Sequence, residues 1–183
     1  MSPEDRRSED EARLERRARQ LAAVPEKQGD RRVAATVAVV AVGEERFGIP
    51  VEGLRGILKA PAIARLPGMP EWLPGIVQVR GELMSALDLG RWFQVAGGAE
   101  PAYLAVVEGS RGALGLLVES VEGFREVGEE EIAQKLTAAP RAAGRPIRAT
   151  TRDLVTLLDI ERLLESPQIV VGQELSGEAD RGC

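Results

Sequence analysis

Few residues of this chain could perform acid–base, nucleophilic or metal chemistry. The 183-residue sequence contains no histidine, and its single cysteine is the terminal Cys183. Histidine is the commonest general base and metal ligand, so its absence excludes most hydrolytic and metal sites, and it excludes a phosphorylated histidine outright. Neither phosphate-binding glycine motifs nor a nucleophile elbow occur in a suitable context. We therefore expect no enzyme, no cofactor and no metal.

The carboxylates also favour structural roles. Asp88 and Asp159 each stand between a predicted strand and a predicted short helix, where an aspartate caps the first helical N–H groups. The run Glu129–Glu131 cannot converge on one substrate, because its residues are consecutive. It is more typical of a solvated helix start, with Ile132 and Leu136 facing the core.

Residues suited to protein binding occur in the first half of the chain. Gly81 allows a positive φ in a tight turn and would project Arg80 outward, where its planar fork of donors suits an interface. An ordinary exposed arginine in a turn explains the same pattern. The segment 66–75 is stiffened by three prolines and carries Met69 and Trp72. It either offers contact area to a partner or folds over the end of a barrel with Trp72 buried.

The elements that must position these residues are short strands rich in valine and leucine. Short segments at close spacing with frequent glycines favour small barrels or sandwiches over a parallel sheet. The predicted strands are Val33–Val42, Phe47–Val51, Ile76–Val79, Leu83–Leu87, Tyr103–Val107, Leu114–Val121, Ile147–Thr150 and Leu154–Leu158, with a hairpin turn at 43–46 and short helices at Leu89–Phe93 and Ile160–Leu164.

The chain contains an internal duplication. Residues 36–57 match residues 103–124 at an offset of 67, and residues 76–93 match residues 147–164 at an offset of 71. The matches occur in the same order without gaps. They predict a mainly β protein of two similar units that pack together, because neither unit alone buries enough apolar surface. Whether the units exchange strands stays open at this point.

Charge and composition divide the chain further. The formal net charge is −5; residues 1–32 hold nine basic and eight acidic residues, which leaves −5 − 1 = −6 for the rest. An acidic chain is a poor nucleic-acid binder, and the apolar run Val33–Val42 is too short to cross a membrane. We expect a cytoplasmic protein with a charged extension at 1–32, which is either disordered or a short helix. The duplicated domain is expected at 33–168, with halves at about 33–95 and 99–168, followed by a tail at 169–183.

Residues 47–89, FGIPVEGLRGILKAPAIARLPGMPEWLPGIVQVRGELMSALDL, resemble the CheW-like coupling domain of bacterial chemotaxis. The shared pattern is an F-G-I-P-V strand, a Leu-Pro-x-x-Pro loop, and a Gly-Ile-x-x-x-Arg-Gly run that ends in Asp-Leu. The second half resembles the family through YLAVVE, GLLVESV and LLDIERLL. The resemblance covers about 33–168. It implies two small five-stranded, SH3-like barrels packed together.

The resemblance also implies a function. Such domains are non-catalytic adaptors between the cytoplasmic tip of a chemoreceptor and the CheA-like regulatory domain of a histidine kinase. The protein-binding positions it implies are Arg80, Gly81, Gly75, Leu54, Ile57 and Met84. The chain departs from the family pattern at Gly56, where glutamate is usual, and at Ser85, where proline is usual. The alternative is a divergent regulatory module that binds a kinase or another partner without a receptor.

Overall fold

The computed structural model describes residues 32–133 and 145–169. The chain divides into Met1–Arg32 and Val33–Cys183, and every element described below belongs to the second part. Residues 1–31 of the predicted charged extension, the tail from residue 170 and Leu136 lie outside the described residues.

Strands dominate the described residues. The elements in chain order are β1 (Val33–Val42), β2 (Glu45–Pro50), the 3-10 turn η1 (Val51–Gly53), β3 (Leu54–Lys59), β4 (Ala64–Arg65), β5 (Gly75–Val79), β6 (Glu82–Asp88), α2 (Leu89–Phe93), β7 (Tyr103–Gly109), β8 (Gly112–Val118), β9 (Ser120–Gly128), η2 (Glu129–Glu131), β10 (Ile132–Ala133), β11 (Ile147–Thr151), β12 (Val155–Leu158) and α3 (Ile160–Leu164). The expectation of a mainly β fold with short helices is confirmed.

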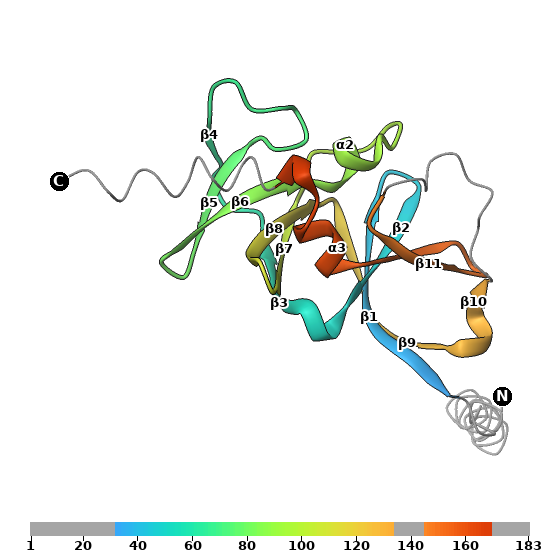
Figure 1. Ribbon diagram of the computed structural model, residues 1–183. Helices are drawn as coiled ribbons and strands as arrows, with labels where there is room; N and C mark the ends of the chain where they lie inside the picture. The colour runs from blue at the N-terminus through green and yellow to red at the C-terminus, as the bar shows by residue number, and fades with distance from the viewer. Residues whose placement is uncertain (1–31, 134–144, 170–183) are drawn as a thin grey trace, which may run out of the picture. The chain divides into compact units, whose positions relative to one another are not determined.

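The strands form two six-stranded sheets that lie side by side (Figure 1). Sheet A has the order β10-β11-β12-β2-β1-β9, and sheet B has the order β3-β7-β8-β6-β5-β4. The β1–β2 hairpin therefore pairs with strands of the second half, and the β7–β8 hairpin pairs with strands of the first. The two halves of the sequence exchange hairpins, so each sheet contains strands from both halves.

The sheets repeat one plan. Reversing the order of sheet B gives β4-β5-β6-β8-β7-β3, in which each strand is the duplicate of its counterpart in sheet A. The registers agree as well. Gly48 lies opposite Leu157 in sheet A, and its duplicate Gly115 lies opposite Ala86 in sheet B. The offsets of 67 and 71 found in the sequence thus correspond to equivalent places in the fold.

Apolar burial explains the uninterrupted valine run of β1. Val37 and Val39 point into the cluster inside sheet A, whereas Ala38, Val40 and Val42 join the central cluster between the sheets. The duplicate strand β7 divides in the same way: Leu104 and Val106 face the cluster inside sheet B, and Ala105 and Val107 face the centre. A strand buried on both faces reads as a continuous apolar run.

Four details of the predicted elements were wrong. The stretch 114–121 is not one strand, because β8 ends at Val118 and β9 begins at Ser120, and β3 was not predicted at all. β3 and β9 escape the pattern because a bulge interrupts each strand beside a glycine, Gly56 and Gly123. Glu129–Glu131 is a single 3-10 turn that leads into β10, so it does not begin a helix. The turn after β1 is also tighter than expected, since Val42 pairs with Glu45.

The two aspartates cap their helices as predicted. The Asp88 carboxylate accepts a hydrogen bond from the Arg91 backbone N–H at 3.0 Å, and that of Asp159 accepts from the Arg162 N–H at 3.0 Å. Each satisfies an N–H group that has no partner within the helix. Among the described residues, no helix combines the length and the apolar character needed to span a membrane.

Candidate functional site

The predicted turn at Arg80-Gly81 is the tip of the β5–β6 hairpin. Val79 pairs with Glu82, so the loop contains two residues, and both have positive φ: 53° at Arg80 and 88° at Gly81. This is the geometry of a type I′ turn, whose twist matches that of the flanking strands. Asparagine or glycine usually occupies its first position, so an arginine there accepts some backbone strain. Arg80 is exposed, as predicted.

A hollow opens beside this hairpin tip, between β3 and the β5–β6 hairpin. Its volume is about 210 Å³. We call it the β3 hollow; its lining residues are Arg55, Gly56, Ile57, Leu58, Gln78, Val79, Arg80, Glu82, Met84 and Val106. Leu58, Val79, Met84 and Val106 also belong to the apolar cluster inside sheet B. The hollow is therefore an apolar depression that leads toward the interior of that sheet.

Charged residues surround the rim of the β3 hollow. The Arg55 guanidinium lies 2.9 Å from a carboxylate oxygen of Glu82 and 3.5 Å from one of Glu108. The Arg55–Glu82 side chains are 43% and 50% exposed, so this pair contributes little to stability. It does occupy the carboxylate of Glu82. Arg80 has no ion pair within the described part of the chain and is free to meet an anionic group of a partner.

The structure brings together three of the six predicted binding residues. Ile57, Arg80 and Met84 line the hollow, and Gly81 is beside Arg80 in the turn. Leu54 begins β3 and packs against the central core. Gly75 is buried with φ 155°, and a Cβ there would lie 2.1 Å from the Ala64 carbonyl oxygen. Close pairing of β4 with β5 therefore requires glycine at position 75, so a structural role accounts for Gly75.

The equivalent place in sheet A holds a network of charged side chains. Arg125, the duplicate of Leu58, lies 2.8 Å from the Asp153 carboxylate and 3.2 Å from that of Glu131. The Thr151 hydroxyl, at the position of Arg80, donates to Asp153 at 2.6 Å. This hydroxyl and the Arg125 guanidinium hold the pKa of Asp153 below its ordinary value of 3.8. We call Arg125, Glu131, Thr151 and Asp153 the Arg125 cluster. The sequence reasoning missed it, although comparing the two halves would have shown arginine in place of leucine.

Sequence and structure comparisons agree on the family. The model of the CheW-like domain matches residues 36–168. The chain belongs to the CheW-like domain family. It is 27% identical over 138 residues to the protein FrzA of Myxococcus xanthus, covering 68% of this chain and 82% of that protein. It is 20% identical to the chemotaxis protein CheW of Treponema pallidum, covering 70% of this chain and 81% of the relative.

A solved structure shares the fold of this CheW-like domain. The scaffolding protein TtCheW from Thermoanaerobacter tengcongensis superposes with a TM-score of 0.60 at 20% identity, over 68% of this chain and 86% of that one. The family assignment makes the chain a CheW-like scaffold or adaptor domain of chemotaxis signalling, which confirms the predicted family.

The two departures from the family pattern have distinct settings in this CheW-like domain. Gly56 follows the bulge of β3 and lines the β3 hollow, and nothing lies within 4 Å of where its Cβ would be. Its duplicate Gly123 follows the matching bulge of β9 with φ 139°, a conformation that favours glycine. Ser85 is buried within β6.

The proline-containing loop packs onto the CheW-like domain, as one of its two predicted roles requires, but Trp72 is only partly buried. Trp72 and Met69 are partly buried against the central core, and Leu73 is fully buried. The rings of Trp72 and Trp92 meet edge to face with centroids 4.7 Å apart. The Asp88 N–H also donates to the Trp72 carbonyl at 2.8 Å. Trp72 therefore anchors the loop to α2.

Leu83 is a site residue that sequence reasoning did not single out. It lies on β6 beside the hairpin tip and is 68% exposed, and its duplicate Leu154 is 74% exposed. Exposed leucines offer apolar contact to a partner.

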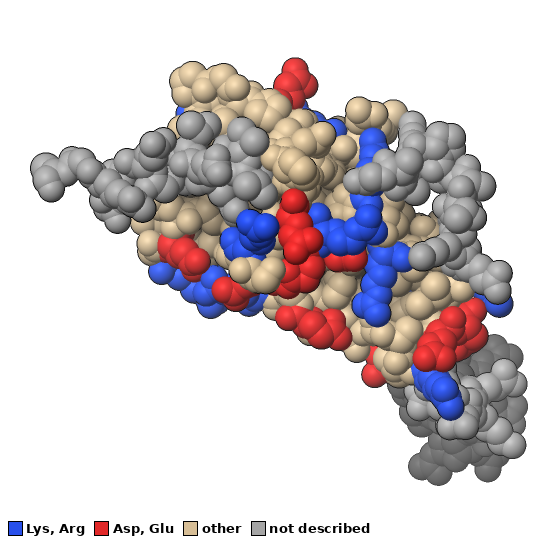
Figure 2. Space-filling view, in the orientation of Figure 1, with Lys and Arg blue, Asp and Glu red and all other residues tan. Residues whose placement is uncertain are grey.

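In the part of the chain that the structure describes, no group of acidic or cysteine side chains could hold a metal ion. On the face shown in Figure 2, basic and acidic side chains alternate.

Proposed function

We propose that this CheW-like domain is a cytoplasmic, non-catalytic adaptor that couples chemoreceptors to a chemotaxis-type histidine kinase. The observation that carries the proposal is the meeting of Ile57, Arg80 and Met84 at one open hollow in a domain of this family. The partners would be the regulatory domain of the kinase and the cytoplasmic tip of the receptor. Docking of one of them would use the β3 hollow.

The chemistry of the hollow supports protein binding. Its floor is apolar, and Leu83 adds exposed apolar surface beside it. Interfaces concentrate their binding energy in a few residues, with arginine among the most enriched. Arg80 is held on the rim by a turn that fixes its backbone. A pre-positioned cation next to an apolar depression loses little entropy when a partner docks.

Titration calorimetry with Arg80→Ala tests this proposal. The regulatory domain of a chemotaxis-type kinase and a chemoreceptor tip, both from the same organism, would be titrated separately into the full chain. We expect Arg80→Ala to weaken binding of at least one of them by about tenfold or more, the loss typical of an interface hot spot. Arg111→Ala is the matched control, because Arg111 is also an exposed arginine in a hairpin turn.

The outcomes separate the alternatives. If the unaltered chain binds neither partner, the adaptor proposal is wrong. Binding of the kinase domain alone would favour a regulatory module that works without a receptor. Equal affinities of Arg80→Ala and Arg111→Ala for both partners would remove Arg80 and the β3 hollow from the interface.

A further inference from the structure

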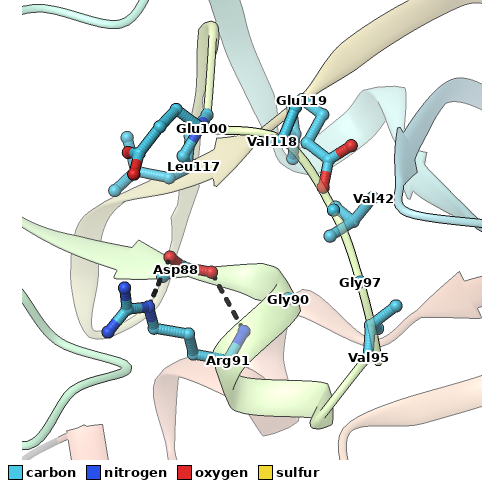
Figure 3. Close-up of a pocket in the computed structure, with 13 residues that line it drawn as sticks. Val42, Asp88, Gly90, Arg91, Val95, Gly97, Glu100, Leu117, Val118 and Glu119 are labelled. Carbon is cyan, nitrogen blue, oxygen red and sulfur yellow. Dashed lines mark hydrogen bonds and ion pairs between the residues drawn. The ribbon is translucent and has the colours of Figure 1, made fainter.

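A second depression lies beside α2, away from the β3 hollow. Two hollows of about 270 and 310 Å³ share five lining residues: Asp88, Arg91, Glu100, Pro101 and Leu117. The two hollows adjoin along these shared residues, and we call the pair the α2 groove. One end lies against Val42, Val95 and Glu119, as Figure 3 shows. The other end lies under the loop that carries Met69 and Pro70.

The duplication shows why this groove is open. On the other side of the domain, Glu161 of α3 closes the equivalent place. Its carboxylate accepts from the Ser110 hydroxyl at 2.7 Å and from the Ser110 N–H at 3.2 Å. The residue of α2 at the position of Glu161 is Gly90, which has no side chain and lines the groove. Glu119 takes over the hairpin N–H group there, accepting from Gly43 at 3.0 Å.

The α2 groove has apolar walls and an acidic rim. Its apolar lining includes Ile63, Leu66, Met69, Pro74, Pro101, Val95 and Leu117. Four carboxylates, of Glu71, Asp88, Glu100 and Glu119, face only two guanidinium groups, of Arg65 and Arg91. The lining therefore carries two more negative charges than positive ones.

The four carboxylates are only partly compensated by cations of the groove itself. The Arg91 guanidinium is already shared, at 3.3 Å from Asp88 and 3.5 Å from Glu71. Glu100 is exposed and has no ion pair within the described residues. An anionic partner would be repelled, and a wholly apolar one would bury Glu100 without a counter-charge, which is costly. A partner with lysine or arginine beside its apolar side chains meets both requirements.

We propose that the α2 groove is a second docking surface, which takes a partner segment whose apolar side chains are flanked by basic ones. The occupant lays its apolar side chains on Leu117 and under the proline-containing loop. Its cations pair with Glu100 and Glu119. An adaptor that holds two partners at once needs two such surfaces, and this groove shares no lining residue with the β3 hollow.

The test uses the full chain and a short, fluorescein-labelled peptide of leucine and lysine. Two peptides serve as comparisons, one with serine in place of leucine and one with glutamate in place of lysine. We expect the leucine–lysine peptide to bind best and to shift the amide resonances of Arg91, Glu100 and Leu117 in NMR titrations. Glu100→Lys should weaken its binding by about tenfold, because one attraction becomes a repulsion.

Glu122→Lys is the matched control, since Glu122 is an exposed glutamate on β9 outside the groove and undergoes the same change of charge. It should leave the affinity within about twofold of the unaltered chain. Equal losses in the two variants would mean a diffuse charge effect and would overturn the proposal. It would also be overturned by resonance shifts centred elsewhere, or by equal binding of the serine–lysine peptide. The Arg80→Ala variant should bind the peptide normally, so the peptide result stands even if no partner docks at the β3 hollow.

Discussion

The β3 hollow and the Arg125 cluster are equivalent places in the two sheets, yet one is an apolar hollow and the other holds paired charged side chains. Leu58 and Arg80 stand in sheet B where Arg125 and Thr151 stand in sheet A. In sheet A, Arg125 pairs with the carboxylate of Asp153. Beside sheet B, the arginine is Arg80, and it lies in the exposed turn of a hairpin. Duplication thus supplied one architecture twice. A few differences in side chains give sheet A the Arg125 cluster and sheet B the β3 hollow.

The largest expected effect on stability comes from removing the arginine of the Arg125 cluster. Arg125→Ala deletes the ion pairs with Asp153 and Glu131 and the packing of its aliphatic stem. We expect the free energy of unfolding to fall by about 1 to 2 kcal/mol, because the lost hydrogen bonds join charged groups that are only partly exposed, 32% for Arg125 and 42% for Asp153. Urea denaturation measures it. Arg125→Lys should recover only part of the loss, because lysine cannot make the two-pronged contact. A change below about 0.5 kcal/mol would show that the cluster does not stabilise the fold.

A pair of equivalent carboxylates sharpens the comparison. Asp153→Ala removes two hydrogen bonds from Arg125 and one from Thr151, so we expect a loss of about 1 kcal/mol. Glu82, its duplicate, makes one exposed contact with Arg55, and Glu82→Ala should cost about 0.5 kcal/mol or less. The two variants would be compared in the same denaturation series. Equal losses of unfolding free energy in the two variants would contradict the distinction between the Arg125 cluster and the rim of the β3 hollow.

The smallest effect is a dependence on pH. Because folding lowers the pKa of Asp153, its contribution to stability is present above the unfolded value of about 3.9 and is lost as the pH falls through the folded value. The melting temperature of the unaltered chain should therefore fall more steeply below about pH 4 than that of Asp153→Asn. Parallel curves for the two proteins would show that Asp153 does not titrate differently in the folded state.

Much of the fold was predictable from residue pattern. The continuous valine run of β1 and the capping aspartates depend on neighbours close in sequence, and the gapless repeat is found by aligning the chain with itself. β3 and β9 were not recognised because their bulges break the alternation on which strand prediction rests. The turn at Arg80-Gly81 was predictable because two-residue turns have strong local preferences.

The sequence by itself determined that the chain is duplicated, mainly β, and poor in catalytic groups, because these properties depend on composition and local order. Only the tertiary structure decided that the halves exchange hairpins, since strand pairing joins residues far apart in the chain. It also decided that Ile57, Arg80 and Met84 meet at one hollow while Arg125 pairs with Asp153 at the equivalent place in sheet A. Whether such a place is an apolar hollow or holds paired charges depends on side chains from several strands, which no local pattern brings together.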